Sequence, residues 1–266
     1  MTDRLPAVDL PTMAAALRAE RTEMLNFTSS LTDDEWTAPS AAAGWRIADV
    51  VAHIGATARN FYTPAGLRTT FAASLEQLNE DPVDRRRDWS RADVMAEYQR
   101  ASRRATALLD VVRRTPATRV RVRLAELGRY PMGLMIGGAL VFDHHTHLRH
   151  DMAPALGRPV PPTDADRMRA VLTWMIAVLS NQVAQAPVAG LDARVALTLT
   201  DPGGGTWWID QAGSVAPSKA VAAHVTAPAL TLPDWGTQRS PWRDSDVTIT
   251  GDTELAARFL DAVNVI

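Results

Sequence analysis

The sequence predicts an α+β protein of two domains: a four-helix bundle over residues 1–158 and a smaller α+β domain with an antiparallel sheet over residues 159–266. Three observations lead to this prediction. Apolar residues recur at helical spacing through the first half, the proline-rich stretch APALGRPVPPTD follows, and apolar residues then alternate with a period of two. With 266 residues, 46% of them hydrophobic, the chain is long enough to bury a core in each domain.

Four helices are expected in the first domain. Ser90 and Asp93 form a start similar to a capping box for the third helix, and RVRVRL after it is a short candidate strand. The fourth helix, over about residues 131–152, contains MGLMIGGALVF, which is apolar on nearly all sides and so indicates the central helix of a bundle. The apolar stripes of the first three helices are Leu10, Met13, Leu17, Met24, Phe27 and Leu31; Ile47, Val50, Val51, Ile54 and Phe61; and Met95, Tyr98, Ala105, Leu109 and Val112.

The second domain begins with a helix that Thr163 and Asp166 are expected to cap. Alternating apolar residues then precede the turn DPGGG and the segment TWWID, which is a hairpin pattern. DVTITGD is a further candidate strand, and ELAARFLDAV is a candidate closing helix.

Composition excludes several classes of protein and of site. Lys and Arg total 28 against 30 Asp and Glu, so the chain lacks the basic surplus of a nucleic-acid-binding protein. No apolar run approaches the ~20 residues of a membrane span, and MTDRLPAVDLP lacks the apolar core of a signal peptide, so we expect a cytoplasmic protein. The absence of cysteine excludes disulfides, thiolate ligands and a protein thiol nucleophile.

The six histidines are distributed unevenly, with four of them in the segment FDHHTHLRHDM. Asp143 and His147 are four residues apart and so share one helix face. His53, on the second helix, can complete a site of three ligands with an open position, which is the pattern of a catalytic metal centre. The pairs His144 with His147 and His147 with Asp151 also fit, and the cluster fits an ordinary solvated helix face as well.

The segments that carry these histidines resemble the DinB-like superfamily, in particular the mycothiol-dependent maleylpyruvate isomerase group. DEWTAPSAAAGWRIADVVAHI is similar to the family's first ligand region, and FDHHTHLRHDMAPALGRP is similar to its second ligand helix. DVTITGDTELAARFLDAVNV resembles the family's appended sterol-carrier-like domain, so the resemblance covers nearly the whole chain.

This resemblance implies one Zn²⁺, or another divalent metal, held by His53, Asp143 and His147, and mycothiol, a small actinobacterial thiol, as co-substrate. The implied protein is an enzyme, either an isomerase that adds and then eliminates the thiolate or a transferase that leaves the thiol on a small-molecule electrophile. We expect glutamate at the position of Asp143 in the isomerase itself. The resemblance also implies an arginine from the second domain, for which Arg239 is preferred to Arg243.

The residues alone also allow other roles. Asp49, one turn before His53, either orients the imidazole or favours the start of its helix. A metal-dependent hydrolase, in which the metal activates water, is one alternative function. A non-catalytic protein that binds an apolar small molecule in its second domain is another.

Overall fold

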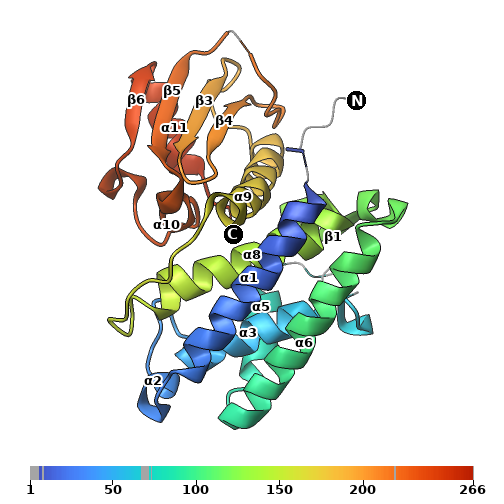
Figure 1. The fold of residues 1–266 in the computed structure, drawn as a ribbon. Coiled ribbons are helices and arrows are strands. Elements are labelled where there is room, and N and C mark those ends of the chain that lie inside the picture. Colours follow the sequence, from blue (N-terminus) through green and yellow to red (C-terminus); the bar gives the residue numbers. More distant parts are fainter. Residues whose placement is uncertain (1–5, 8, 67–71, 73, 219, 266) are drawn as a thin grey trace. The chain divides into compact units, whose positions relative to one another are not determined.

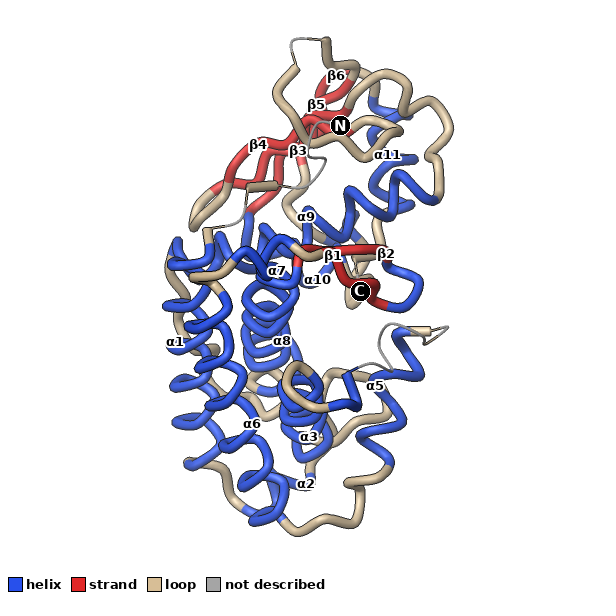
Figure 2. Tube along the Cα trace, turned by 90° about the vertical axis from the view of Figure 1, so that its right-hand side faces the viewer, coloured by secondary structure: helices blue, strands red, loops and turns tan. Residues whose placement is uncertain are grey.

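The computed structural model describes residues 6–7, 9–66, 72, 74–218 and 220–265. The chain divides into two compact units, of which one is Asp9–Thr163 and the other contains the residues from Asp164 onward. The first, or N-terminal, unit is mainly helical, and the second, or C-terminal, unit carries a sheet with helices (Figures 1 and 2). This is the α+β class that the sequence predicts. None of the described helices is long and apolar enough to cross a membrane.

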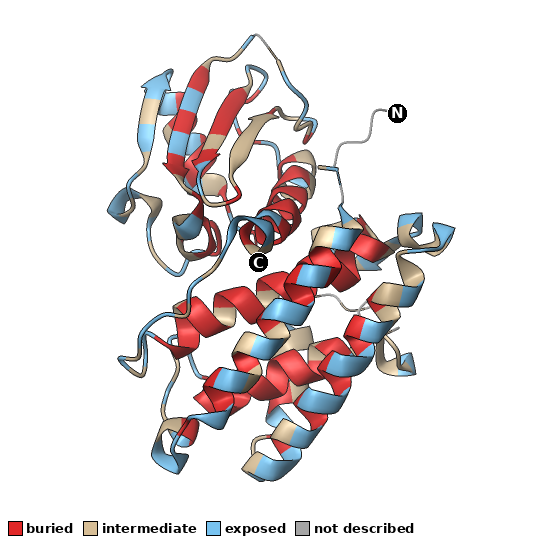
Figure 3. Ribbon diagram, viewed as in Figure 1, coloured by how far each residue is buried: buried red, intermediate tan, exposed pale blue. Residues whose placement is uncertain are grey.

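Several helices of the N-terminal unit begin at side chains that accept hydrogen bonds from free backbone N–H groups. The Asp9 side chain caps the first helix by accepting from the backbone N–H of Thr12. The Ser90 side chain caps a later helix by accepting from the backbone N–H of Asp93. Buried residues follow one side of the helices that begin after Asp9 and Ser90, and exposed residues the other (Figure 3). The elements are α1 (Leu10–Ser29), α2 (Asp33–Thr37), α3 (Ile47–Asn60), η1 (Pro64–Gly66), α5 (Leu75–Asp84), α6 (Arg91–Val112) and η2 (Pro116–Arg119).

The last helix of this unit is continuous but irregular. It consists of α7 (Met132–Leu134), η4 (Met135–Ala139), α8 (Leu140–Thr146) and η5 (His147–Met152), of which η4 and η5 are π-helical. The predicted helix over residues 131–152 is therefore present, with two wider turns that apolar periodicity does not reveal. Short π-helical turns occur often at functional sites, and η5 begins at a candidate ligand.

A short hairpin precedes that helix. Strands β1 (Arg121–Leu124) and β2 (Gly128–Pro131) pair in antiparallel fashion, with η3 (Ala125–Leu127) between them. The candidate strand in RVRVRL is β1. Its partner β2 was not predicted. The Glu126 carboxylate accepts from the backbone N–H of Leu75 and so ties the hairpin to the start of α5.

A hydrophobic core joins α3 to the surrounding helices of the N-terminal unit. On α3 the fully buried side chains include Ile47, Val50, Val51 and Ile54, as the predicted stripe requires. The same cluster contains Trp36 and Trp45 from the segment before α3. This packing makes α3 a rigid support for the residues that it carries toward α8.

The C-terminal unit begins with α9 (Ala165–Gln185), whose N-cap is Asp164 rather than the expected Thr163. The Asp164 carboxylate accepts from the backbone N–H groups of Asp166 and Arg167, while Thr163 lies beside His145, with 3.1 Å between Oγ1 and Nε2. The division after Thr163 lies five residues beyond the predicted end at 158, and that boundary stays a prediction. Hydrogen bonds from Arg149 to the carbonyl oxygens of Pro161 and Pro162 hold this proline-rich segment on the N-terminal unit.

The described strands of the C-terminal unit form a four-stranded sheet of order β4-β3-β5-β6. The predicted hairpin pairs Val195 with Ile209 in antiparallel fashion, and β6 contains the predicted TIT segment. The sheet is mixed and not purely antiparallel as predicted, because β5 lies between β3 and β6 and runs parallel to β3. The strand β5 was not predicted. The elements are β3 (Val195–Thr200), β4 (Gly205–Ile209), β5 (Ala223–Pro228), η6 (Ala229–Thr231), α10 (Leu232–Gly236), η7 (Trp242–Asp244), β6 (Thr248–Gly251) and α11 (Thr253–Ala262).

Candidate metal centre

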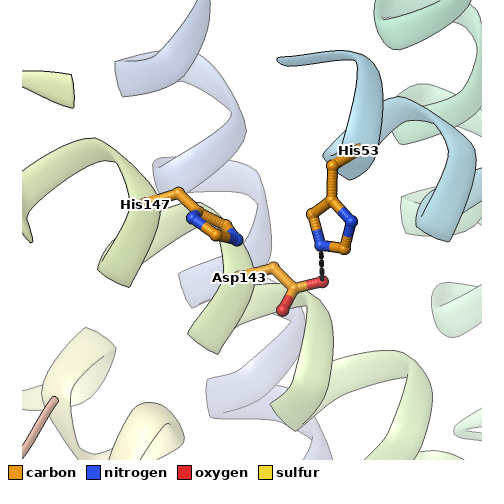
Figure 4. A group of neighbouring side chains, drawn as sticks. All are labelled: His53, Asp143 and His147. Carbon is orange, nitrogen blue, oxygen red and sulfur yellow. Dashed lines mark ion pairs between the residues drawn. The ribbon is translucent and has the colours of Figure 1, made fainter. Parts of the chain in front are cut away.

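Three polar side chains converge in the N-terminal unit: His53 from α3, Asp143 from α8 and His147 from the start of η5 (Figure 4). Each offers one ligand atom, and these atoms all lie within 4.8 Å of one another. The His53 Nε2 is 3.8 Å from an Asp143 carboxylate oxygen, and the centroids of the two imidazole rings are 5.2 Å apart. The structure thus brings together the three residues that the sequence analysis singled out as a metal site.

Burial and helix geometry explain why these side chains meet. His53 is only 5% exposed and lies on α3 among buried apolar residues, so its imidazole points into the bundle. Asp143 and His147 are one turn apart on the opposite helix and keep side-chain exposures of 16% and 11%. A small exposed fraction is what a site open to one small molecule requires.

Asp151 fixes the orientation of His147. Its side chain is fully buried, and one carboxylate oxygen lies 2.7 Å from the His147 Nδ1. An ionised carboxylate only accepts hydrogen bonds, so the Nδ1–H of the imidazole donates and the Nε2 lone pair is left for another partner. This is the arrangement in which a carboxylate orients a metal-binding histidine.

The segment before α3 places an aromatic ring against both imidazoles. The Trp45 ring centroid is 4.9 Å from that of His53 and 6.1 Å from that of His147. The Trp45 indole nitrogen donates to the Glu80 carboxylate on α5 over 2.6 Å. In the sequence, Trp45 stands out only as part of the motif that resembles the family. Nothing in the pattern around Glu80 distinguishes Glu80 from other charged residues.

Asp49 serves the start of α3. Its carboxylate accepts from the backbone N–H and the guanidinium of Arg46, and the Arg87 guanidinium lies 3.5 Å away. Burial alone would raise the pKa of Asp49, but the hydrogen bonds and charge of Arg46, with the charge of Arg87, lower this pKa overall. These contacts support the helix-start alternative for Asp49.

The neighbouring histidines have other partners. His144 is fully buried, its Nδ1 lies 2.7 Å from the Leu140 carbonyl oxygen, and its ring is 5.7 Å from that of Tyr98. Burial, the largest influence, lowers the pKa of His144 to about 4, so this imidazole is neutral at physiological pH. The rings of His145 and His150 lie 6.4 Å apart. The described contacts of His144 favour its reading as a core residue.

The predicted arginine belongs to the C-terminal unit. Arg239 is exposed in the turn after α10, where its backbone N–H donates to the Asp234 carbonyl and its guanidinium donates to the Thr237 hydroxyl. Arg243 forms two hydrogen bonds with the carboxylate of Asp261. The proposed role of Arg239 therefore stays a prediction.

Known proteins resemble this chain in sequence over its N-terminal unit and in fold over nearly its whole length. Residues 17–147 match the family described as the mycothiol maleylpyruvate isomerase N-terminal domain, and this range includes all three converging residues. None of the curated proteins matches the chain.

Two solved structures share the fold. A crystal structure of a histidine-to-alanine mutant of the mycothiol-dependent maleylpyruvate isomerase is 16% identical, with a TM-score of 0.55, and covers 91% of this chain and 93% of its own. A crystal structure of the mycothiol-dependent maleylpyruvate isomerase is 15% identical, with a TM-score of 0.53 and the same coverage. Identities this low show the fold alone, and they confirm the predicted class across both units.

Proposed function

We propose, from the premise that the N-terminal unit belongs to the mycothiol maleylpyruvate isomerase N-terminal domain family, that this chain is a metal-dependent enzyme that isomerises a maleylpyruvate-like substrate with mycothiol as co-substrate. The observation that carries the proposal is the convergence of His53, Asp143 and His147 within the part of the chain that matches the family. The metal would be zinc or another divalent ion held by these three side chains.

The donor set fits such an ion. Two imidazole nitrogens and one carboxylate oxygen are typical ligands of catalytic zinc, and three protein ligands leave one position open. Ligands with bonds of ~2.1 Å in a tetrahedral site lie about 3.4 Å apart, close to the 3.8 Å between His53 and Asp143. The short side chain of Asp143 therefore reaches toward His53 without the additional methylene of glutamate.

The protein's own residues hold and shield the reacting groups. His53, Asp143 and His147 would bind the ion, Asp151 keeps the His147 proton on Nδ1, and Trp45 covers one side of both imidazoles. When bound, the ion lowers the pKa of a coordinated thiol, so that the nucleophilic thiolate is available near neutral pH.

The proposed reaction has two covalent steps and no net change in protons. The mycothiol thiolate adds to one carbon of the cis double bond, a C–S bond forms, and the π electrons move onto the conjugated carbonyl as an enolate. The remaining C–C single bond then rotates. Return of the electrons re-forms the double bond as trans, breaks the C–S bond and releases the thiolate.

The test is an assay with purified mycothiol and maleylpyruvate, in which NMR follows loss of the cis and gain of the trans isomer. We expect isomerisation that requires both mycothiol and the metal and that is lost in the His53→Ala and His147→Ala variants. His224→Ala, which removes an exposed histidine on β5, is the matched control and should stay active. A stable thiol conjugate would replace the isomerase proposal with a transferase, and hydrolysis products formed without thiol would replace it with a hydrolase.

We also propose that Arg239 binds a carboxylate of the substrate or a polar group of the thiol. Its support is the family resemblance and a guanidinium in an exposed turn. Arg239→Ala should raise KM for mycothiol or the substrate at least tenfold and leave the metal content unchanged. Arg243→Ala is the control, because its guanidinium already pairs with Asp261. Equal KM values for Arg239→Ala and the unaltered protein would contradict this role.

A further inference from the structure

We propose that Trp45, held in place by Glu80, is a positioning residue that sets the ring orientations of the two histidines in the candidate metal centre. This inference rests on the proposed function, since it concerns the same site. It adds a residue from outside the three candidate ligands. The Trp45 indole contacts His53 on α3 and His147 on η5, and it is hydrogen-bonded to Glu80 on α5. The sequence separates Trp45 from Glu80 by 35 residues, and the fold brings them into contact.

The indole meets both imidazoles in a tilted arrangement. Its plane is inclined by 42° to the His53 ring and by 32° to the His147 ring, whereas those two rings are inclined by 74° to each other. Trp45 is 9% exposed, so these contacts lie in the interior of the unit. A flat ring packed against two neighbouring imidazoles of different orientation limits the rotation of both.

The backbone around Trp45 is itself tied to the helix that carries His147. The Trp45 carbonyl oxygen accepts from the backbone N–H of Ser40, and the backbone N–H of Ala41 donates to the Asp151 carbonyl oxygen. Gly44, directly before Trp45, has a φ of +79°, a conformation that favours glycine. The loop that presents the indole is therefore a closed turn bonded to η5.

Glu80 removes the remaining freedom of the indole. The Nε1–H of Trp45 donates to a Glu80 carboxylate oxygen over 2.6 Å, a charge-assisted hydrogen bond, and Arg87 lies 3.7 Å from the other oxygen. Because this bond uses the polar edge of the indole, the ring presents carbon atoms to the imidazoles.

The test measures metal binding without any enzymatic activity. Metal-free protein is loaded with Co²⁺, whose visible absorption reports the geometry of its ligands, and the Zn²⁺ affinity is measured by competition with a chromophoric chelator. The variants are Trp45→Phe, Trp45→Ala, Glu80→Ala and Glu80→Gln. Unfolding by urea is followed for each variant, so that a loss of stability is measured separately from a loss of affinity.

We expect Trp45→Ala to weaken Zn²⁺ binding about 10- to 100-fold, the range found when partners that orient metal ligands are removed. Glu80→Ala should weaken it several-fold and alter the Co²⁺ spectrum. Glu80→Gln should keep most of the Zn²⁺ affinity and the Co²⁺ spectrum of the unaltered protein, because the amide oxygen still accepts the indole hydrogen bond. Trp45→Phe keeps an aromatic face but loses the anchor, so it should resemble Glu80→Ala.

Trp36→Phe is the matched control. Trp36 lies in the same hydrophobic cluster and is 5% exposed, but its ring lies under the Arg91 guanidinium. This variant should lose stability and keep the Co²⁺ spectrum and Zn²⁺ affinity of the unaltered protein. If Trp45→Ala does not fold, Glu80→Ala carries the test, since Glu80 has a side chain that is 42% exposed.

The outcomes separate this inference from the proposed function. Unchanged Zn²⁺ affinity and Co²⁺ spectrum in Trp45→Phe and Glu80→Ala, with metal bound by the unaltered protein, would overturn the positioning role alone. Absence of metal binding in the unaltered protein would overturn both proposals. Equal losses in Trp36→Phe and Trp45→Phe would assign the effect to general core packing and would also overturn the positioning role.

Discussion

Asp151 is a fully buried carboxylate that hydrogen-bonds the imidazole of His147. The sequence spacing allowed it to be a ligand, but the structure shows it bonded to Nδ1 of a candidate ligand. We expect Asp151→Asn to weaken Zn²⁺ binding about 10- to 100-fold, because the neutral amide no longer fixes the proton on Nδ1. Competition with a chelator measures this effect, and isothermal titration calorimetry provides a second measurement.

Asp49→Asn is the control for that experiment. Asp49 is as deeply buried as Asp151, but its carboxylate is hydrogen-bonded to Arg46 at the start of α3. Loss of its charge should lower the free energy of unfolding by about 1.5–3 kcal/mol, as for other hydrogen bonds to charged groups, and leave Zn²⁺ affinity nearly unchanged. A loss of affinity equal to that of Asp151→Asn would show that Asp49 orients His53 instead.

The sequence predicted the candidate site unevenly. The spacing of Asp143 and His147 places both on one helix face, so their proximity follows from periodicity alone. The choice of His53 also depended on the family resemblance, because a single histidine on a half-apolar helix has many possible roles. Trp45 and Glu80 were not predicted as a pair, since contacts between segments far apart in the sequence leave no local pattern.

Among the elements, α2 shows how a surface ion pair makes one short helix dependent on pH. Its capping box joins Thr32 and Glu35, and Arg158 donates two hydrogen bonds of 2.7 Å to the Glu35 carboxylate. The hydrogen bonds from Arg158, with that from the backbone N–H of Thr32, lower the pKa of Glu35 from 4.5 to about 2. The ionised form is therefore favoured in the folded protein.

This shift predicts the direction of a stability change. The contribution of Glu35 is fully present above pH 4.5, where the unfolded carboxyl is also ionised, and is lost as pH falls from 4.5 toward 2. Urea unfolding of the unaltered protein and of Glu35→Gln at pH 6, 5, 4 and 3 measures it. The difference between the two proteins should shrink at each step below pH 5. A constant difference at all four pH values would show that the Arg158 contacts do not shift the ionisation of Glu35.

The elements themselves were predicted best where a long stripe of apolar residues exists. The helices α1, α3, α6 and α9 have such stripes and lie where the sequence places them. The short helix α5 is mostly polar and contains Pro82, so no long apolar stripe predicts it. The strand β5 alternates buried and exposed residues, but two of its three fully buried side chains are alanines and it ends in proline, so its strand signal in the sequence is weak.

At the scale of the whole molecule, the candidate metal centre lies entirely within the N-terminal unit. His53, Asp143, His147 and the contacts of Trp45 and Asp151 all fall between Asp9 and Thr163. We expect residues 9–163, expressed alone, to bind Zn²⁺ with an affinity within about threefold of that of the full chain, in a chelator competition. The isolated unit should lack isomerase activity if Arg239 is required. Loss of Zn²⁺ binding in a folded isolated unit would show that the C-terminal unit completes the site.

The π-helical segment η5 also sets the directions in which the side chains after His147 point. A π-turn holds one residue more than an α-turn, so side chains after it are displaced around the helix relative to a regular α-helix. In a regular α-helix of the same sequence, Asp151 would therefore point in another direction relative to His147 than it does here.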